Sequence, residues 1–360
     1  MKAVLLAGGF GTRLRPLSCT RPKLLFPLLG RPLVDFQLER LAQSGVDEVV
    51  IAVHHMAEIL MAEIGDERYG MRIRYSIEQE PLGTGGAIRW ARRYIGDEEF
   101  LAMNGDVVSD LDLKSLIDFH KSHDAAATIA LYEVEDPRRF GVAVLEDDNR
   151  IRCFVEKPRD PSVGRAVNAG VYILTPDVFR YLPEQGACAI ERTAFPKLAE
   201  EGKLYGFVHK GLWLDVGLPP DYLRANFALL DRQGSFISEE ARVSERATVN
   251  PPVYIRRGAV IEEDAHIGPY AIIDQGVWVG RGARIEECVV FPFAHIGHHA
   301  SLRGAVVGEH ARIGRWVKVE TNCIISDFAK IGDNATLISG VRVCPYKEVR
   351  ESIFEPRIVT

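Results

Sequence analysis

A glycine-rich segment with two arginines directly follows the first apolar run of the chain, Lys2–Ala7. It reads Gly8-Gly9-Phe10-Gly11-Thr12-Arg13-Leu14-Arg15-Pro16-Leu17, and Pro22-Lys23 comes shortly after. Glycines permit a tight turn in which backbone N–H groups approach phosphate oxygens. The segment is neither of the two common phosphate loops, because Leu14 replaces the third glycine of G-x-G-x-x-G and no Gly-Lys-Ser/Thr follows. The added cations favour a phosphate-binding loop over a flexible loop with solvated arginines.

Two aspartates stand in apolar surroundings and could serve a metal ion. Asp106, in Asn104-Gly105-Asp106, follows the apolar run Phe100–Met103, and Asp215 lies in Trp213-Leu214-Asp215-Val216-Gly217. Acids at the carboxyl ends of parallel strands lie where open α/β sheets bind ligands, although a single such Asp is more often a cap or turn residue. Together the two could hold Mg²⁺, which prefers hard oxygen ligands. The sequence leaves open whether they meet in space.

Two further polar groups lie at the ends of apolar runs. Glu156-Lys157-Pro158 ends one run, and Asn168-Ala169-Gly170 opens the next. A lysine beside a glutamate is usually a solvated surface pair, whereas Phe154-Val155 before it and the proline after it favour a fixed position at a strand end. Both interpretations stay open from the residues alone.

The first 230 residues alternate short β-rich runs with amphipathic stretches. Strands are expected at 2–7, 48–53, 72–77 and 100–103, and helices at 32–44, 57–64, 84–94 and 222–230. This alternation predicts βαβ units and a mostly parallel, Rossmann-like α/β sheet. After Ala125 the pattern loosens, and runs at 140–144 and 151–155 around Asp147-Asp148-Asn149 predict a hairpin.

A six-residue period replaces the helical one from about residue 243. Aliphatic residues recur from Val243 to Ile285 and again from Val307 to Val343, the phase slipping near Ile296 and Leu302. Small residues, usually alanine, follow four positions later. This period predicts a parallel β-helix, because ordinary strands keep a period of two. We therefore expect two domains, 1–232 and 241–360, with a polar linker near 231–240.

Composition bounds the function classes. The chain has 360 residues and a formal charge of -6, which argues against nucleic-acid binding by a basic surface. Its six scattered cysteines form no CxxC pair, which favours free, mostly buried thiols over disulfides. No apolar run is long enough for a membrane span or a signal-peptide core. The expected location is cytoplasmic, with no membrane partner.

Taken together, these segments resemble the nucleoside-diphosphate-sugar pyrophosphorylases, or sugar-1-phosphate nucleotidyltransferases. The resemblance covers essentially the whole chain, since many members join a nucleotidyltransferase domain to a left-handed β-helix of hexapeptide repeats. Its motifs are the Gly8–Leu17 signature and the spacing to Lys23, Asp106, Glu156-Lys157 and Asp215. One departure is Leu24, where the family commonly has a second proline in Pro-Lys-Pro.

The resemblance implies a role for each matching residue. Arg13, Lys23, Asp106, Lys157 and Asp215 would be catalytic, with Asp106 and Asp215 holding the Mg²⁺ cofactor. The remaining residues are expected to bind the two substrates. Those expected on the nucleotide are Leu6, Ala7, Gly8, Gly9, Gly11, Thr12, Arg13, Lys23, Glu80, Gly83 and Thr84, and those on the sugar phosphate are Asn104, Gly141, Glu156, Lys157 and Asn168.

The implied reaction joins a nucleoside triphosphate to a sugar 1-phosphate. A phosphate oxygen would attack the α-phosphorus in line and expel pyrophosphate, with cations neutralising the repulsion between two anions. The 80–84 run, Phe291-Pro292 and the ending from Cys344 to Ile358 look most like mannose-1-phosphate guanylyltransferases, which use GTP. Glucose-1-phosphate thymidylyl-, uridylyl- and adenylyltransferases share the catalytic motifs and stay as alternatives.

Two other classes of function compete with this one. Left-handed β-helices often belong to acyltransferases with a histidine between coils, and His295, His298 and His299 suit that role, although a loop or coil-edge position explains them more simply. A non-catalytic regulatory subunit would be expected to lose the signature residues, which this chain keeps. The β-helix would then serve a homo-oligomer or regulation.

Overall fold

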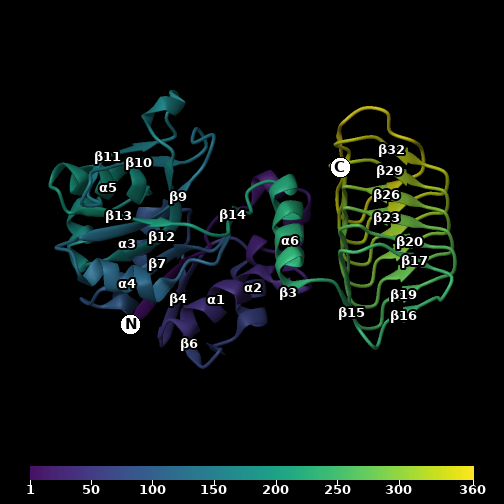
Figure 1. Ribbon diagram of the computed structural model, residues 1–360, viewed down its shortest axis with the longest axis horizontal. Coiled ribbons are helices and arrows are strands. Elements are labelled where there is room, and N and C mark those ends of the chain that lie inside the picture. The colour runs from purple at the N-terminus through teal and green to yellow at the C-terminus, as the bar shows by residue number, and fades with distance from the viewer. The chain divides into compact units, whose positions relative to one another are not determined.

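The computed structural model describes all 360 residues. The chain forms two compact units, the first made of Met1–Phe10 and Leu33–Asp215 and the second of Gly11–Pro32 and Val216–Thr360 (Figure 1). These units follow spatial contact, whereas the domains 1–232 and 241–360 follow periodicity and stay a prediction. The difference is that Gly11–Pro32 and helix α6 (Pro219–Gln233) group with the hexapeptide repeats.

The first unit is built on one ten-stranded sheet. Its main path runs β11-β10-β12-β7-β1-β4-β6-β5, with β9 paired to β12 and to β13. Strands β7, β1, β4 and β6 are parallel, as the alternation of strands and helices predicts, and β12 joins β7 antiparallel. The strands are β1 Lys2–Leu6, β4 Glu48–Val53, β5 Glu67–Arg68, β6 Met71–Ile77, β7 Phe100–Asn104, β9 Ala127–Glu133, β10 Gly141–Leu145, β11 Ile151–Glu156, β12 Ala166–Leu174 and β13 Leu204–His209.

Five helices belong to this unit: α1 Leu33–Gln43, α2 Ala57–Ile64, α3 Gly83–Ile95, α4 Leu113–Lys121 and α5 Ile190–Glu200. Helix α3 buries a stripe of small and aliphatic residues and ends at Gly96, whose φ of 81° suits glycine. The side chain of Asp112 caps α4 by accepting from the Lys114 amide at 3.0 Å. Strands β10 and β11 form the predicted hairpin. Two short strands, β8 (Val107–Ser109) and β14 (Trp213–Asp215), pair with each other.

The repeats of the second unit form the predicted left-handed β-helix, with three stacks of parallel strands (Figure 1). Inward positions such as Ile273, Val290, Val307 and Ile325 fill its core. In the first stack paired residues are 18 positions apart, apart from Arg342 and Ile358, which are 16 apart, and the successive partners Ile272, Val289 and Val306, which are 17 apart. This shortening by one residue accounts for the phase slip in the sequence. The stacks are β15-β18-β21-β24-β27-β30-β33-β35 (from Phe236–Ile237 to Ile358–Val359), β16-β19-β22-β25-β28-β31-β34 (from Arg242–Val243 to Glu348–Val349) and β17-β20-β23-β26-β29-β32 (from Thr248–Val249 to Thr336–Leu337).

One outward face of the β-helix differs from the other two. In β21, β24, β27 and β30 the outward residues are Ile272, Val289, Val306 and Ile324, each at most 2 % exposed. Other segments of the same unit cover this side, since Phe291 at the end of β24 meets the rings of Phe26 and Tyr222. The outward residues of the second stack are instead mostly polar or aromatic, among them Trp278, His295, Arg312 and Lys330.

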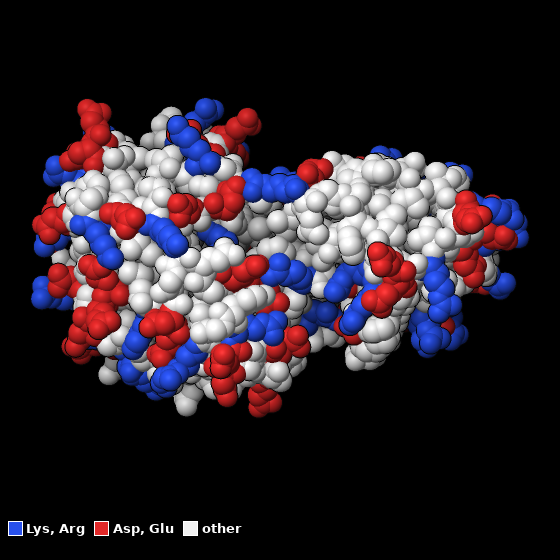
Figure 2. Space-filling model, turned by 60° about the horizontal axis from the view of Figure 1, so that its bottom comes forward, with Lys and Arg blue, Asp and Glu red and all other residues white.

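Three predictions from composition can be compared with the structure: surface charge, the state of the cysteines and membrane-spanning helices. Acidic and basic side chains are interspersed over the face shown in Figure 2, without one dominant basic patch. All six cysteines are free, as expected, but the expectation that most are buried is wrong, because only Cys288 and Cys323 are. None of the helices combines the length and the apolar character that a membrane crossing requires.

Candidate functional site

The carboxyl ends of three adjacent parallel strands, β7, β1 and β4, bring the first site residues together. Leu6 of β1 pairs with Asn104 of β7, and the Gly105 amide donates to the Leu6 carbonyl at 3.0 Å. On the other side of β1, the Ala7 amide donates to Ala52 of β4 at 2.8 Å. Leu6, Ala7 and Gly8 therefore leave the sheet directly beside Asn104-Gly105-Asp106, at the edge where open α/β sheets bind ligands.

The two aspartates expected to hold metal lie on paired strands. Asp215 of β14 stands opposite Val107 of β8, and Asp106 is the residue immediately before Val107. The ring of Trp213 holds β14 in place: it stacks on Tyr132 at 5.3 Å and its Nε1 donates to the Ala169 carbonyl at 3.0 Å. Both aspartates are half-buried.

The donor set of this pair fits Mg²⁺. The structure gathers no group of three or more His, Cys, Asp or Glu side chains at a metal-binding spacing, so two carboxylates are what the protein offers. Magnesium is commonly bound by one or two carboxylates, with waters and substrate phosphates as the other ligands.

The residues expected to contact the sugar also converge. Gly141 pairs with Glu156, and a Cβ at Gly141 would come within 2.5 Å of the Phe154 ring and 2.8 Å of the Glu156 carboxylate, so a larger residue would displace these side chains. Asn168 of β12 accepts from the Gly170 amide at 2.8 Å. A Cβ at Gly170, whose φ is 75°, would meet the Asn104 amide nitrogen at 2.7 Å. Polar side chains from β7, β11 and β12 thus line one region of the sheet.

Lys157 lies just beyond β11, as a strand-end position predicts. Its φ is 52°, and its ammonium lies 3.5 Å from the Glu156 carboxylate. The lysine side chain is 58 % exposed. It is therefore a solvated partner of Glu156 that is also fixed at the end of a strand, and both sequence interpretations hold in part.

The segment expected against the base is anchored to a neighbouring loop. Gly83 has a φ of 69°, and a Cβ there would lie 2.6 Å from the Cys188 carbonyl. The Thr84 hydroxyl donates to Glu191 at 2.6 Å and accepts from the Ile190 amide. Glu80, by contrast, is exposed.

Glu78 is a residue that the sequence analysis missed. It is only 4 % exposed and lies against the phosphate-loop glycine, since a Cβ at Gly8 would be 3.3 Å from both of its carboxylate oxygens. Its Oε2 accepts from the Leu82 amide at 3.0 Å, while its buried Oε1 has no partner within the protein. Burial raises the pKa of Glu78, which the Leu82 amide and the charge of His54 partly oppose. The available signal was an acid directly after the last residue of β6, Ile77.

A hydrogen-bond network connects the segment expected against the base with a residue expected to contact the sugar. The sequence analysis missed this network too. Glu191 accepts from Thr84 and, at 3.5 Å, from the Tyr172 hydroxyl, which in turn accepts from Asn168 at 2.9 Å. Burial raises the pKa of Glu191, and the hydrogen bond from Thr84 opposes this shift. Glu191 and Tyr172 carry no motif of their own, so only the fold reveals them.

Four predicted site residues, Gly11, Thr12, Arg13 and Lys23, belong to the second unit. Gly11 adopts φ 59° and begins a short 3₁₀ turn, Thr12–Leu14, in which Leu14 is buried and Arg13 is exposed. The Ser18 hydroxyl donates to the Gly11 carbonyl at 2.8 Å, which fixes the turn. Lys23 starts a second 3₁₀ turn and is half-buried.

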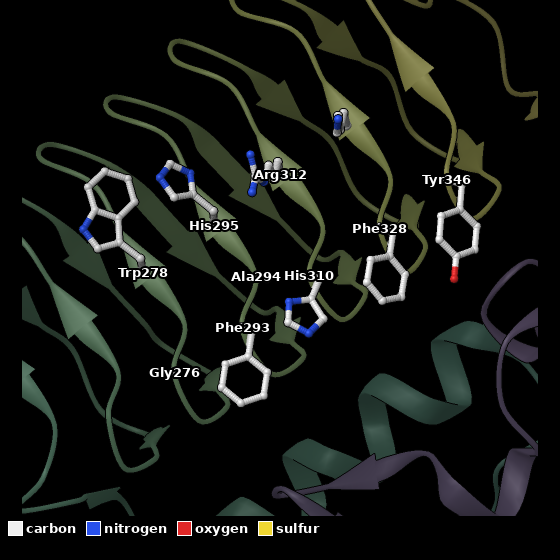
Figure 3. Close-up of a pocket in the computed structure, with 10 residues that line it drawn as sticks. Gly276, Trp278, Phe293, Ala294, His295, His310, Arg312, Phe328 and Tyr346 are labelled. Atoms are coloured by element: carbon white, nitrogen blue, oxygen red, sulfur yellow. The ribbon is translucent and has the colours of Figure 1, made fainter. Parts of the chain in front are cut away.

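A separate groove of about 770 Å³ runs along the β-helix. Figure 3 shows its two walls, one with Trp278, His295 and Arg312, the other with a ladder of rings at the coil corners. In this aromatic ladder, formed by Phe293, His310, Phe328 and Tyr346, successive ring centroids are 4.9 to 5.1 Å apart. Phe293, Phe328 and Tyr346 are 47, 40 and 70 % exposed.

The three histidines considered for acyl transfer take structural positions. His298 and His299 lie at a coil edge, after β25 (His295–Ile296), and His299 stacks on Trp316 at 4.1 Å. His295 projects from β25 itself and stacks on Trp278 at 4.1 Å. The coil-edge explanation thus holds for two of the three.

Comparison with known proteins supports the same chemistry. A family model described as Nucleotidyl transferase matches residues 2–232, and one described as GMPPB C-terminal domain matches residues 249–359. A probable mannose-1-phosphate guanylyltransferase 2 of Oryza sativa subsp. japonica is 37 % identical, and the catalytic subunit beta of the Danio rerio mannose-1-phosphate guanylyltransferase is 38 % identical. Both alignments cover 100 % of each chain.

Solved structures resemble about two thirds of the chain. HddC of Yersinia pseudotuberculosis, crystallised with GMP-PN, is 32 % identical with a TM-score of 0.55, covering 63 % of this chain and 99 % of that one. A putative glucose-1-phosphate thymidylyltransferase of Bacillus anthracis is 25 % identical with a TM-score of 0.59, covering 66 % and 98 %. The chain therefore belongs to the nucleotidyl transferase family, and the protein is a sugar-1-phosphate nucleotidyltransferase.

Proposed function

We propose that the protein transfers a guanylyl group from GTP to mannose 1-phosphate and releases pyrophosphate and GDP-mannose. The observation that carries the choice of base is the partnerless oxygen of Glu78 beside Gly8. Guanine presents two adjacent donors, N1–H and the 2-amino group, whereas adenine has an acceptor at N1. A buried carboxylate accepts from both guanine donors and rejects adenine.

The relatives support the same substrates. The Oryza and Danio proteins are named mannose-1-phosphate guanylyltransferases, and the Yersinia structure holds GMP-PN. Each alignment covers 100 % of this chain and 100 % of the relative. Both predicted domains therefore have counterparts in the plant and fish proteins.

The chain's own residues would divide the work as follows. Arg13 and Lys23 neutralise the triphosphate, Lys157 the sugar phosphate, and Gly141, Glu156 and Asn168 hold the sugar. The phosphate oxygen of mannose 1-phosphate attacks the α-phosphorus, and the bond to the bridging β-phosphate oxygen breaks. Asp106 and Asp215 would hold Mg²⁺, which would supply positive charge that offsets the charge on the phosphates. Positioning and electrostatics suffice, without a covalent enzyme intermediate.

We also propose that the protein is a homo-oligomer that associates through the aromatic ladder of its β-helix. Exposed rings in one contiguous row are unusual for a surface that faces only water. The opposite wall of the groove carries the cations Arg312 and Lys330, which suit a second copy of a chain whose formal net charge is -6. The cytoplasmic location stays a prediction from the sequence.

Pyrophosphate release with Mg²⁺ tests the reaction, with each nucleoside triphosphate offered against mannose 1-phosphate and glucose 1-phosphate. We expect release with GTP and mannose 1-phosphate, and a loss of at least about 100-fold in Asp106→Asn, because the metal supplies several kcal/mol of charge stabilisation. Release with another pair keeps the mechanism and overturns the substrates. No release with any pair overturns the reaction.

A further inference from the structure

The segment that carries Arg13 and Lys23 is tied to the β-helix by a buried ion network. Arg21, two residues before Lys23, donates to Asp327 at 3.0 Å and also to Glu309. The neighbouring Thr20 hydroxyl donates to Asp327 at 2.6 Å. Asp327 and Glu309 lie in the coils after β30 (Ile324–Ile325) and β27 (Val306–Val307), within the same compact unit as Arg21.

Each member of this network is fixed by more than one contact. The second carboxylate oxygen of Asp327 accepts from the Glu309 amide at 2.7 Å, and the Asp327 side chain is only 3 % exposed. The Arg21 guanidinium lies 5.3 Å from the centre of the Phe291 ring. Burial alone would lower the pKa of Arg21, but Asp327 and Glu309 outweigh it and raise the pKa. The network therefore holds Arg21 in a single geometry.

The surroundings indicate that the segment could pack on the β-helix without these charges. The same face of the β-helix offers Ile272, Val289, Val306 and Ile324, which bury apolar surface without directional contacts. A buried ion pair is often no more stable than well-packed apolar residues, whereas the loss of one partner is costly. What the charges add is a defined direction and register.

A second contact holds the other end of the segment. Arg256 donates to the Gly30 carbonyl at 2.8 Å, and Asp274 accepts from Arg256 at 2.6 Å. Arg342 donates to the Arg15 carbonyl at 3.1 Å. Another coil aspartate shows the contrast: Asp333 accepts from the Arg315 amide at 2.7 Å and pairs with the Arg315 side chain, both inside the β-helix. Asp333 thus makes the same coil contact as Asp327 without holding the segment.

We propose that Asp327 and Glu309 are positioning residues for nucleotidyl transfer, which act through Arg21 to fix the turns that present Arg13 and Lys23 to the nucleotide. The inference rests on the proposed function for the roles of Arg13 and Lys23. It assigns to the β-helix an indirect, positioning part in catalysis that its sequence repeats do not suggest.

The test compares Asp327→Asn with Asp333→Asn in the full-length protein. For Asp327→Asn we expect kcat/KM for GTP to fall about 10- to 100-fold, with a raised KM for GTP, because displaced catalytic groups cost that much. The KM for mannose 1-phosphate should stay within about twofold. Loss of folded enzyme would instead lower kcat and leave both KM values unchanged. Asp333→Asn should match the wild type in all three quantities.

A double-mutant cycle isolates the pathway through Arg21. If Asp327 acts through Arg21, then Arg21→Gln combined with Asp327→Asn should reduce kcat/KM no more than the worse single variant. Glu309→Gln, which changes a 30 % exposed side chain, replaces Asp327→Asn if the latter does not fold. Additive losses, or equal increases in both KM values, overturn the proposal.

Amide hydrogen exchange tests whether the network anchors the segment, independently of whether the enzyme catalyses the proposed reaction. Amides of Gly11–Pro32 should exchange faster in Asp327→Asn and not in Asp333→Asn. If the wild type releases no pyrophosphate, the proposed function fails and the catalytic role of the network fails with it, while exchange still decides whether the network anchors the segment. Unchanged exchange in Asp327→Asn overturns the anchoring.

Discussion

Glu78 illustrates how much a single buried side chain contributes at the residue scale. It stands at the end of β6, with one oxygen satisfied by Leu82 and the other left without a protein partner. An unsatisfied buried oxygen costs about 1–3 kcal/mol, so a site retains one where a ligand completes it. In the proposed function, guanine completes it with two donors.

Replacing Glu78 by glutamine should change the choice of nucleotide. In Glu78→Gln we expect kcat/KM for GTP to fall about 10- to 100-fold, because hydrogen bonds to a charged group are worth about 1.5–3 kcal/mol. Steady-state kinetics with GTP, ATP and UTP would show a smaller ratio of kcat/KM for GTP to kcat/KM for the other two nucleotides than in the wild type. Glu80→Gln, two residues on and exposed, is the matched comparison, and a larger loss there would place the base on Glu80 instead.

The pH dependence of GTP binding follows from the same residue. Burial raises the pKa of Glu78 above its ordinary value, so the carboxylate takes up a proton at a higher pH than a solvated glutamate does. As the pH falls, GTP binding by the wild type should therefore begin to weaken at a higher pH than it would with a solvated glutamate. The Glu78→Gln variant should lack this pH dependence when the KM for GTP is measured as a function of pH.

At the scale of elements, the β-helix depends on the stacking of its inward rows. Each coil contacts only its neighbours, so a cavity in one coil weakens two interfaces. Ile325 is fully buried between Val307 and Val343 in the first stack.

Ile325→Ala should destabilise the β-helix by about 2–5 kcal/mol, the usual cost of such a core cavity. Urea unfolding followed by circular dichroism measures the change. Lys318→Ala, an exposed position on a neighbouring stack, should stay within about 0.5 kcal/mol of the wild type. An equal loss in both variants would contradict the assignment of inward and outward rows.

At the scale of the whole molecule, the proposed homo-oligomer rests on the exposed rings of the aromatic ladder. We expect Phe328→Glu to shift the protein to a smaller species in light scattering after size-exclusion chromatography, because a charge would be buried between rings. Trp316→Glu changes a ring that is more exposed than Phe328 and is stacked on His299 at another corner, and it should leave the mass unchanged. A monomeric wild type would refute the oligomer, and an equal effect of Trp316→Glu would refute the interface.

The sequence by itself determined the architecture, because both patterns are local. The alternation of strands and helices predicted that β1, β4, β6 and β7 belong to a mostly parallel sheet. The six-residue period predicted the β-helix even across the two places where successive strands of the first stack are 17 residues apart. The phosphate loop, the two aspartates and Glu156-Lys157 could be selected because their chemistry is visible in short motifs. Family resemblance supplied their roles.

Only the tertiary structure decided which distant residues share a site. Glu78 and Glu191 have no motif, and their importance comes from burial beside Gly8 and Thr84. Arg21 reads as an ordinary surface cation until the fold places it against Asp327, about 300 positions later in the chain. Hydrophobic periodicity shows on which face of its own helix or strand a side chain lies. A long-range ion pair depends instead on how elements pack against one another, which no local pattern encodes.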